Sequence, residues 1–473
     1  MRAVVGYEEK DPEITRHLTS GYPRFVIHPF CRQLAAHVAT ELGLGGHTLW
    51  LTVSLRAAED LAAHLGAAQA TRINHSGLHG VAHPEDPALS IRAKTYLQHT
   101  GGFLSSREAE DRLARLGLVP GVTSETLDTG DALSAVRTVL RKAYPTARDA
   151  DFILTNTGMS AFHAAWRALS DLQAARGRTV WIQLGWLYLD TIAIVRKFAP
   201  TPQDYVYLPD VHNLAALEQV FAERGDRIAG IITEAPTNPL IETSDLATMA
   251  ALAHRHGARV VLDPTLVSPF NVEVLPHADI VVNSLTKYAA SEGDVIAGVI
   301  VINPAGPDAD HLRTHCTLRA ESIYRRDLAR LAAQIGDYES VIAKTNATTP
   351  KVVSFLENHP RVSEVFWSLH PASRDNYLRI ARSPSHVGAM VTFTLRMPLD
   401  RFYDRLRIPK GPSFGMKTSL ICPFIYLAHY DLVTSVSGRA ELAASGLNPE
   451  LLRLSIGCES PDDIIAALAE ALS

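Results

Sequence analysis

The segment Val281–Ile302, VVNSLTKYAASEGDVIAGVIVI, indicates both the fold and the place of the chemistry. An apolar run of the kind that forms a buried strand leads directly into a loop that carries Ser284, Thr286 and Lys287. Open sheets of parallel strands bind their ligands at the carboxyl ends of the strands, where such loops lie. We therefore expect the two hydroxyl groups and the lysine amine to share one ligand site.

Around this segment the sequence alternates short β-branched runs with amphipathic stretches, from about residue 178 to residue 304. This alternation is typical of parallel strands joined by helices that cover both faces of one sheet, and it predicts an α/β fold. The predicted strands are 151–155, 179–184, 205–208, 227–235, 259–263, 278–284 and 295–303, and the predicted helices between them are 190–199, 212–224 and 246–257.

The sequence on either side of this block follows other patterns. A predicted strand over 47–54 and a predicted helix over 56–66 do not extend the alternation. Helical periodicity runs from 311 to 345, and an α+β pattern then continues to a final helix over 462–472. We therefore expect three parts: an N-terminal extension (1–100), a large domain (101–340) and a small C-terminal domain (341–473).

The composition excludes several classes of protein. The 473 residues carry 45 Lys plus Arg against 50 Asp plus Glu, a net charge of −5, so we expect no nucleic-acid partner. The longest apolar run, Val295–Ile302, is far shorter than the about 20 residues that cross a bilayer, so we expect no membrane partner. The N-terminus turns acidic by Glu8, unlike a signal peptide, and this predicts a cytoplasmic protein.

The cysteine and histidine patterns predict neither disulfides nor a metal site. The four cysteines lie far apart and make no CxxC pair, which suits a reducing cytoplasm: Cys31, Cys316, Cys422 and Cys458. Close histidine pairs such as His254 and His256 lack the i, i+4 spacing and the companion glutamate of a zinc-binding helix. We therefore expect no metal ion.

A carboxylate joins the lysine at the predicted ligand edge of the sheet. Asp263 ends the strand over 259–263, and 24 residues, about one excursion of the chain, separate it from Lys287. This pair suits pyridoxal phosphate, because a lysine amine forms a Schiff base with the aldehyde and a carboxylate holds the pyridine nitrogen protonated. Either residue alone is more often a solvated lysine or a helix cap. Their combination with Ser284 and Thr286 favours the cofactor.

Two further segments fit the same cofactor. A predicted strand, 151–155, leads through a turn at Gly158 into a helix that begins near Met159, and the N–H groups at a helix start bind anions such as a phosphate. Tyr188 follows the strand over 179–184 and suits stacking on a planar ring, although an isolated aromatic residue more often belongs to a core.

These residues belong to motifs that resemble a known family. The motifs are TGM (157–159), YLDT (188–191), EAPTNPL (234–240), VLDPT (261–265), SLTKY (284–288), SFGMKTSL (413–420) and LLRLSIG (451–457). Their order is similar to that of the Cys/Met-metabolism pyridoxal-phosphate enzymes, which include cystathionine gamma-synthase, the cystathionine lyases, methionine gamma-lyase and O-acylhomoserine sulfhydrylase. The resemblance runs from about Phe103 to the C-terminus. It implies a fold type I transferase, like aspartate aminotransferase, with a mostly parallel seven-stranded sheet between helices.

Other segments resemble the longer, fungal-type cystathionine gamma-synthases. They are VGYEEKDPEIT (5–15), SGYPRFVIHP (20–29), YLQHTGGFLSSREAE (96–110) and GWLYLDT (185–191). This resemblance extends into the first 100 residues, which shorter members of the family lack, and it favours replacement chemistry over lyase activity.

The family resemblance assigns roles around the cofactor ring. It makes Lys287 the Schiff-base lysine and proton shuttle, Asp263 the partner of the pyridine nitrogen, and Tyr188 the ring-stacking residue of the catalytic site. Asn238 is implied to contact the phenolic oxygen of the cofactor.

The resemblance also assigns the phosphate and substrate contacts. The backbone of Gly158 and Met159 and the hydroxyl groups of Ser284 and Thr286 are implied to hold the phosphate. Arg453 is implied to bind the carboxylate of an amino-acid substrate, a task that suits a bidentate guanidinium, and Ser413 is expected to line the same pocket.

The sequence departs from the family pattern at the expected subunit contact. The usual Tyr-x-Arg motif, which reaches the phosphate of a neighbouring subunit, is replaced by Ser105-Ser106-Arg107. Arg107 is expected to keep this role, with the tyrosine's contribution lost or supplied elsewhere. The resemblance implies a homodimer or homotetramer with active sites at the subunit interface. Leu189 and Asp190 stand where the family has two glycines, which predicts a reshaped entrance.

The predicted activity is γ-replacement on an O-acyl-L-homoserine by a thiol such as cysteine, a transferase reaction of the EC 2.5.1 type that gives cystathionine or a relative in trans-sulfuration and amino-acid biosynthesis. The alternatives are a cystathionine or methionine lyase, and a specialised-metabolism enzyme that uses another nucleophile. A binding protein that keeps the fold without the chemistry is a further alternative, which the intact set of Lys287, Asp263 and Arg453 disfavours.

Overall fold

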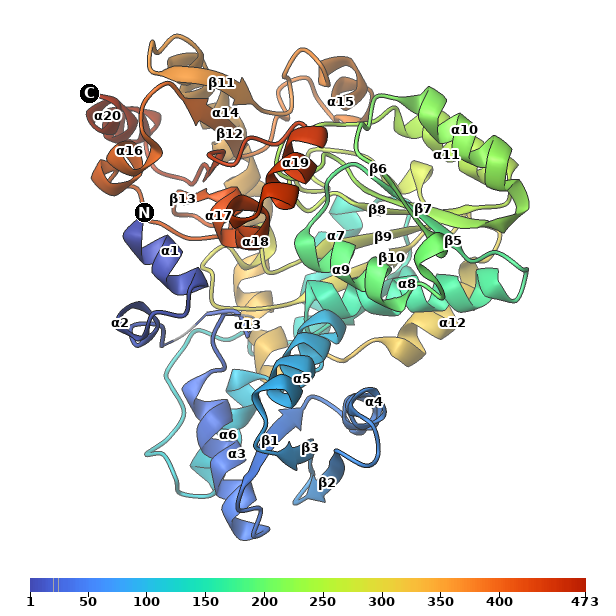
Figure 1. The fold of residues 1–473 in the computed structure, drawn as a ribbon, viewed down its shortest axis with the longest axis vertical. Coiled ribbons are helices and arrows are strands. Elements are labelled where there is room, and N and C mark those ends of the chain that lie inside the picture. The colour runs from blue at the N-terminus through green and yellow to red at the C-terminus, as the bar shows by residue number, and fades with distance from the viewer. Residues whose placement is uncertain (20, 24) are drawn as a thin grey trace.

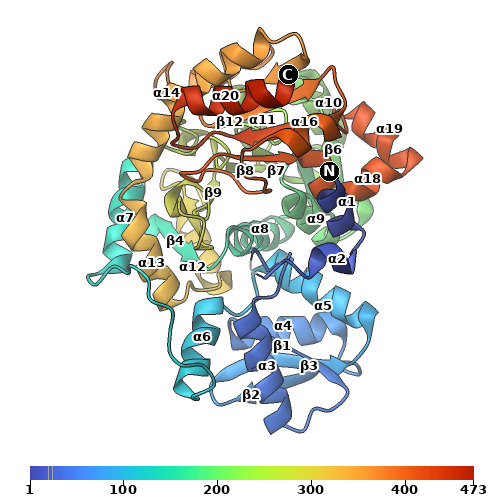
Figure 2. The same ribbon diagram turned by 90° about the vertical axis from the view of Figure 1, so that its left-hand side faces the viewer.

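The structure, a computed structural model, describes residues 1–19, 21–23 and 25–473. Ser20 and Arg24, which belong to the segment 20–29 of the fungal-type resemblance, lie outside the described residues. The elements form three groups (Figures 1 and 2): a central group around the largest sheet, a C-terminal group on one side of it, and an N-terminal group on the other.

Seven strands form the central sheet in the order β4-β10-β9-β8-β7-β5-β6. They are β4 (Phe152–Thr155), β5 (Val180–Leu184), β6 (Tyr205–Leu208), β7 (Ile228–Glu234), β8 (Arg259–Asp263), β9 (Ile280–Ser284) and β10 (Gly298–Ile302). β10 runs antiparallel to both of its neighbours, and the other strands run in one direction. The prediction of an α/β fold with a mostly parallel seven-stranded sheet is confirmed.

The reversed direction of β10 follows from its short connection to β9. A parallel neighbour needs a crossover, which is usually a helix. The segment between β9 and β10 contains only a 3-10 turn at Tyr288–Ala290, so β10 returns antiparallel to β9, between β9 and β4. This return places Lys287 at the carboxyl end of β9.

The strands are apolar on both sides because both faces of the sheet are covered. Successive residues of β8 alternate between two cores, with Val260 and Leu262 in one and Val261 in the other. The first core includes side chains of α7 (Ala132–Ala143), α10 (Leu214–Arg224) and α11 (Leu246–Arg255). The second core includes side chains of α8 (Gly158–Ala174), α9 (Leu189–Phe198) and α12 (Ala309–Arg319).

The helical periodicity predicted over 311–345 is divided among α12 and two further helices, α13 (Arg325–Ile335) and α14 (Tyr338–Glu357). Long-range contacts accompany the break after α12, because the backbone of Glu321 forms hydrogen bonds with the start of α8 and the turn before it. Its N–H donates to the hydroxyl of Ser160 over 3.0 Å, and its carbonyl accepts from the N–H of Asn156 over 2.9 Å.

The C-terminal group contains a four-stranded antiparallel sheet in the order β11-β12-β14-β13. Its elements are β11 (Val362–Phe366), α15 (Arg374–Ile380), β12 (Met390–Leu395), α16 (Leu399–Arg405), β13 (Leu420–Pro423), α17 (Phe424–Ala428), α18 (Tyr430–Thr434), α19 (Val436–Ala444), β14 (Leu452–Ser455) and α20 (Pro461–Leu472). The boundary proposed at residue 340 falls near the start of α14, which packs on both α20 and β11.

The N-terminal group contains a three-stranded antiparallel sheet, β1-β3-β2, with helices around it. The elements are α3 (Pro29–Glu41), β1 (His47–Thr52), α4 (Leu55–Leu65), β2 (Thr71–His75), β3 (Leu78–Pro84), α5 (Pro87–Thr100) and α6 (Ser106–Arg115). The boundary proposed at residue 100 coincides with the end of α5, and α6 beyond it packs on α3.

The first two helices lie apart from the rest of the N-terminal group. α1 (Arg2–Glu8) contacts α17 of the C-terminal group, and α2 (Pro12–Thr15) packs on α1 (Figures 1 and 2). The phenol of Tyr430 donates to the carboxylate of Glu9 over 2.8 Å. The described residues before α3 therefore extend from the C-terminal group to α3.

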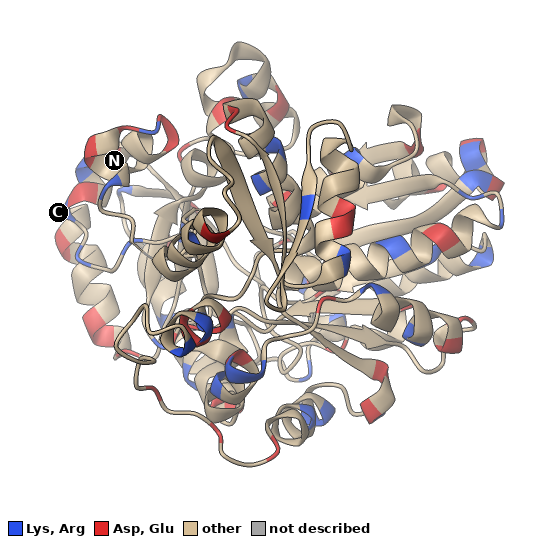
Figure 3. Cartoon of the chain, turned by 90° about the horizontal axis from the view of Figure 1, so that it is seen from below, with Lys and Arg blue, Asp and Glu red and all other residues tan. Residues whose placement is uncertain are grey.

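The outer surface carries charges of both signs. Basic and acidic positions are interspersed along the outer helices in Figure 3. Within the described ranges, no helix is long and apolar enough to span a membrane.

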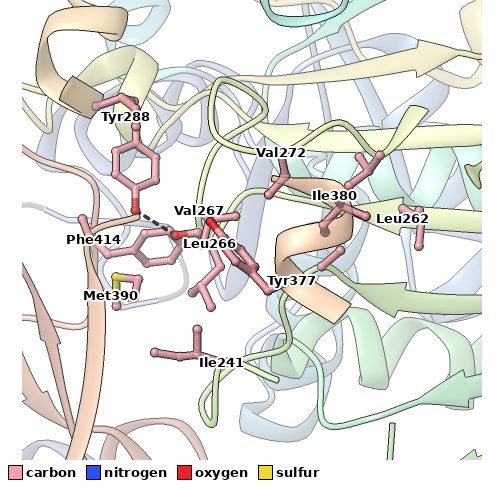
Figure 4. Close-up of a cluster of buried hydrophobic side chains, with 14 of the residues drawn as sticks. Ile241, Leu262, Leu266, Val267, Val272, Tyr288, Tyr377, Ile380, Met390 and Phe414 are labelled. Carbon is pink, nitrogen blue, oxygen red and sulfur yellow. Dashed lines mark hydrogen bonds between the residues drawn. The ribbon is translucent and has the colours of Figure 1, made fainter. Parts of the chain in front are cut away.

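A buried cluster joins the central sheet to the C-terminal group next to Lys287 (Figure 4). Tyr288 donates its phenol hydrogen to the carbonyl of Leu266 over 2.8 Å, and its ring packs on Phe414 at a centroid distance of 6.1 Å. Tyr288 is 1 % exposed, so this hydrogen bond is shielded from water. The bond fixes the loop after β8 to the loop that carries the lysine.

We predict that Tyr288→Phe lowers the free energy of unfolding by about 1 to 3 kcal/mol, because it leaves a buried carbonyl without its donor. Tyr144→Phe is the matched control, since its buried hydroxyl has no hydrogen-bond partner among the described residues. Urea titrations of both variants measure the difference. Equal stabilities of the two variants would contradict the prediction.

Candidate active site

The amine of Lys287 lies in a half-buried position between two aromatic rings. Its Nζ is 4.8 Å from the ring centroid of Tyr22 and 4.9 Å from that of Phe414, distances at which a cation is attracted to a ring face. It donates to the hydroxyl of Tyr22 over 3.0 Å and to that of Ser413 over 3.4 Å. Sequence reasoning placed Ser413 in this pocket and gave Tyr22 no role.

Asp263 ends β8, one strand away from the lysine. Burial raises the pKa of its carboxyl from 3.8 to about 6, against the opposing effects of hydrogen bonds from Thr265 and the charge of Lys287. One of these bonds runs from the Thr265 N–H to Oδ1 over 2.8 Å. A carboxylate that is costly to ionise needs a cationic partner, and a protonated pyridine nitrogen is such a partner.

A second carboxyl group lies beside Asp263. Glu234 ends β7 and is paired in register with Asp263. Burial, together with the charge of Asp263, raises the pKa of Glu234 well above its ordinary value. Glu234 accepts a hydrogen bond from the N–H of Tyr188 over 2.6 Å, which fixes the start of α9. The glutamate was part of a family motif, but sequence reasoning gave it no role.

The start of α8 approaches the end of β9 closely enough to form an anion cradle. A Cβ atom on Gly158 would lie 3.0 Å from the Cβ of Ser284 and 3.1 Å from its hydroxyl oxygen. One on Gly298 would lie 2.5 Å from the carbonyl oxygen of Thr157. The two glycines therefore permit this approach. The first N–H groups of a helix, here those of Gly158 and Met159, have no partner within the helix and suit a phosphate.

The two hydroxyl groups predicted at the phosphate differ in their present contacts. Ser284 faces Gly158, as the close approach shows. Thr286 donates to the carbonyl of Ala297 over 3.1 Å and accepts from the Ala297 N–H over 3.1 Å. Its single hydrogen is thus already used within the chain. A contact of Thr286 with the phosphate stays a prediction.

Thr265 is a site residue that sequence reasoning did not single out. Its hydroxyl oxygen accepts from the N–H of Ser284 over 2.9 Å and from the side-chain amide of Asn283 over 3.0 Å. These bonds fix the loop after β8 to the end of β9. Thr265 therefore holds Asp263 and Ser284 at a constant separation.

Arg453 brings the C-terminal group into the site. It lies on β14, is 4 % exposed, and donates to the side-chain oxygen of Asn238 over 3.1 Å and to the carbonyl of Pro412. Its guanidinium lies 4.5 Å from the ring centroid of Phe424. In the part of the chain that the structure describes, no carboxylate lies within ion-pair distance of it. A buried cation without a counter-ion is expected where a substrate carboxylate binds.

Arg107 is held within this chain. Its guanidinium pairs with Glu125 over 2.7 Å and with Asp327 over 3.0 Å, and it donates to the carbonyl of Asp294 over 2.9 Å. Contact of Arg107 with the phosphate of a neighbouring subunit stays a prediction.

One cavity of about 1970 Å³ connects all of these residues. It is lined by every residue that sequence reasoning placed in the site: Arg107, Gly158, Met159, Tyr188, Asn238, Asp263, Ser284, Thr286, Lys287, Ser413 and Arg453. Its volume exceeds the roughly 300 to 1,000 Å³ of typical ligand pockets. The excess extends toward α3 and the first 27 residues.

Comparison with known proteins agrees with this geometry. The family model described as Cys/Met metabolism PLP-dependent enzyme matches residues 136–473, more than half of the chain. The chain therefore belongs to this family of pyridoxal-phosphate enzymes.

Individual relatives differ in activity. Over 471 residues, which cover 100 % of this chain and 94 % of the relative, the chain is 41 % identical to an L-2-amino-4-chloropent-4-enoate dechlorinase/desaturase of Streptantibioticus cattleyicolor. It is 30 % identical to a cystathionine gamma-synthase of Neurospora crassa over 69 % of this chain and 52 % of that relative. A cystathionine gamma synthase structure from Xanthomonas oryzae pv. oryzae shares the fold, with a TM-score of 0.62 at 22 % identity over 77 % of this chain and 96 % of that one.

The residues of the site fit the cofactor of the family. The cradle between Gly158 and Ser284 accepts a phosphate only because the glycine has no side chain. The desolvated Asp263 carboxyl suits the ring nitrogen, and Lys287, which follows the neighbouring strand β9, lines the same cavity. When bound, the cofactor supplies an electron sink for charge that develops at the substrate Cα.

The raised pKa of Asp263 predicts that the folded state of cofactor-stripped protein becomes less stable as the pH rises. The folded-state pKa of about 6 lies above the ordinary 3.8, so the charged form destabilises the fold above pH 6, and the cost disappears as the pH falls below about 4. Asp263→Asn should therefore raise the stability of stripped protein by up to about 3 kcal/mol at pH 8 and leave it unchanged at acid pH.

Thermal melts of stripped protein across this pH range test the prediction, with Asp375→Asn, an exposed carboxylate on α15, as the matched control. Reloading with cofactor should raise the melting temperature of the wild type more than that of Asp263→Asn. Identical melting temperatures for wild type and Asp263→Asn at every pH would contradict a desolvated carboxylate.

Proposed function

We propose that this enzyme removes a leaving group from Cγ of an L-α-amino acid, and that its main reaction is elimination from an unsaturated substrate with a halogen on C4. The observation that carries this proposal is the 41 % identity, over the full chain, to a relative whose named substrate has chlorine on C4. This identity supports the specialised-metabolism alternative over the synthase.

The side chains divide the work by position. Arg453 is proposed to bind the substrate carboxylate, because it is the buried cation without a carboxylate partner among the described residues. This orients Cα toward the amine of Lys287, which takes the proton of Cα and then a proton of Cβ. Tyr188, Asn238, Gly158, Met159, Ser284 and Asp263 are proposed to hold the cofactor.

The buried cations of the cavity offer one site for a substrate carboxylate. Five further arginines line the cavity. Three of them are paired with acidic side chains: Arg107 with Glu125 and Asp327, Arg326 with Glu110, Asp111 and Glu125, and Arg330 with Glu292 and Asp294. The other two, Arg2 and Arg32, are exposed. A second amino acid, such as cysteine, would need a second site for its carboxylate. Arg453 is the buried arginine of the cavity that lies outside ion-pair distance of every acidic side chain in the described chain, so a second carboxylate would have to bind at an exposed arginine.

Replacement by a thiol on an O-acyl-L-homoserine is the second candidate. It is supported by the sequence motifs and by the 30 % identity to the cystathionine gamma-synthase of Neurospora crassa. Both candidates need the same proton removals from Cα and Cβ. They differ only after the leaving group has departed: in the replacement reaction a thiol then adds, and in the elimination no thiol adds. Assembly as a homodimer or homotetramer, with active sites between subunits, is proposed for either reaction.

Product analysis separates the two candidates. We expect the enzyme to release chloride from L-2-amino-4-chloropent-4-enoate and to give a product lighter by HCl, with no dependence on cysteine. Lys287→Ala should abolish release, because the base is lost, whereas Lys351→Ala, an exposed lysine on α14, should retain it. Mass spectrometry and a chloride assay measure both products.

One outcome of the product analysis would contradict the elimination proposal. Absence of chloride release, together with cystathionine formed from O-acetyl- or O-succinyl-L-homoserine only when cysteine is present, would overturn the elimination proposal in favour of the synthase.

A further inference from the structure

A hydrogen bond between Trp186 and His429 joins the loop before Tyr188 to the C-terminal group. The indole N–H of Trp186 donates to Nε2 of His429 over 3.1 Å, and the two rings pack edge to face at a centroid distance of 5.0 Å. An indole nitrogen only donates, so this Nε2 carries no proton. Trp186 is 8 % exposed, so little water competes for the bond. The proposed function gives neither residue a task.

The loop that ends in Tyr188 is held at three points. The N–H of Gly185 donates to the carbonyl of Leu208 over 2.7 Å, and the N–H of Tyr188 donates to the carboxylate of Glu234 over 2.6 Å. Both bonds tie the loop to the central sheet. The side chain of Trp186 supplies the third point, and of the three it is the one that reaches the C-terminal group. The direction of the Tyr188 side chain therefore depends on the bond from Trp186 as well.

His429 also contacts the aromatic residue that lies against Arg453. It follows α17, the helix that begins with Phe424, and its ring packs edge-on against that of Phe424 at a centroid distance of 6.2 Å. The ring centroid of Phe424 lies 4.5 Å from the guanidinium of Arg453. The backbone N–H of His429 donates to the carbonyl of Ile425 over 2.8 Å, which fixes the histidine at the end of the helix. One histidine therefore connects the residues on the cofactor side with those on the substrate-carboxylate side.

These two sides belong to different groups of elements, so no single sheet fixes their separation. Tyr188 follows β5 of the central sheet, and Arg453 lies on β14 of the four-stranded sheet. An amino acid whose amine joins the cofactor and whose carboxylate binds Arg453 must span both groups. A displacement of about 1 Å between reacting groups can cost about 100-fold in rate. A contact that joins both sides keeps their separation constant.

We propose that Trp186 and His429 are positioning residues. Their hydrogen bond orients the loop of Tyr188 for the cofactor, and the ring of His429 holds Phe424 against the guanidinium of Arg453 for the substrate carboxylate. This inference rests on the roles proposed for Tyr188 and Arg453 and is independent of which group leaves Cγ. Loss of the hydrogen bond should affect the cofactor, and loss of the ring contact should affect the amino acid.

Cofactor binding tests the hydrogen bond. Trp186→Phe should raise the dissociation constant for pyridoxal phosphate, measured by titration of stripped protein, about 3- to 10-fold, the range expected for one neutral hydrogen bond. The circular dichroism of the bound cofactor should also change, because it reports how protein groups lie around the ring. Trp166→Phe is the matched control, since its buried indole N–H has no hydrogen-bond partner among the described residues, and it should bind the cofactor like the wild type.

Amino-acid binding tests the ring contact. His429→Ala should weaken binding of the cofactor and also of L-2-aminobutyrate, which has no leaving group, when loaded protein is titrated and the cofactor absorbance is followed. His429→Gln keeps an acceptor for the indole but lacks the ring. It should restore the cofactor affinity and still bind the amino acid about 3- to 10-fold more weakly than the wild type, the range expected for an aromatic pair. 1-Aminopropane, which lacks the carboxylate, should bind wild type and His429→Gln alike.

Two outcomes would overturn the proposal: equal cofactor affinities of Trp186→Phe and Trp166→Phe, or the same losses of both ligands in His429→Gln and His429→Ala. The comparison of the two His429 variants decides the point without the tryptophan variant, should that protein fail to fold. The expected pattern of losses, in an enzyme that releases no group from any γ-substituted amino acid, would support the positioning role while contradicting the proposed function.

Discussion

The desolvation of the Asp263 carboxyl at the end of β8 is the constraint on which the site depends. Burial raises its pKa to about 6, and its charge contributes to the raised pKa of the buried Glu234 beside it. This carboxyl lies at the edge of the sheet where Lys287 follows the next strand. At the same edge, α8 begins with a glycine that leaves room for an anion. A lysine, a carboxyl in need of a cation and an anion cradle are the three contacts that pyridoxal phosphate requires. The remaining elements hold them in register: Thr265 ties β8 to β9, and Tyr288 ties the lysine loop to Leu266.

The site is completed by segments from both ends of the chain. Arg453 comes from β14 of the C-terminal sheet, and Tyr22 comes from the first 27 residues, which are anchored on the C-terminal group through Glu9 and Tyr430. The two segments meet near Ser413 and Lys287. The N-terminal residues outside the shorter family pattern thus reach the candidate site, since they supply a hydroxyl group beside the amine of Lys287. The relative from Streptantibioticus cattleyicolor matches the chain over this region as well.

Much of this arrangement can be predicted from sequence, for identifiable reasons. Apolar runs such as 259–263 and 280–284 predict strands because both faces of the sheet are buried, and the residues after them then share one edge. Local patterns carry no information on partners far apart in sequence. The reversal of β10, the division of residues 311–345 into separate helices, and the triangle of Tyr22, Ser413 and Lys287 all depend on such long-range contacts. The same limit applies to Arg107, whose three acidic neighbours are 18 or more positions away.

The central claim is that Lys287 is the residue that binds the cofactor. Borohydride reduction of the cofactor-loaded enzyme, followed by proteolysis and mass spectrometry, tests it directly, because reduction makes the lysine–cofactor bond permanent. We expect a pyridoxyl group on the peptide that contains Lys287 and on no other peptide. A pyridoxyl group on a different lysine, or none at all in protein that has taken up the cofactor, would contradict it.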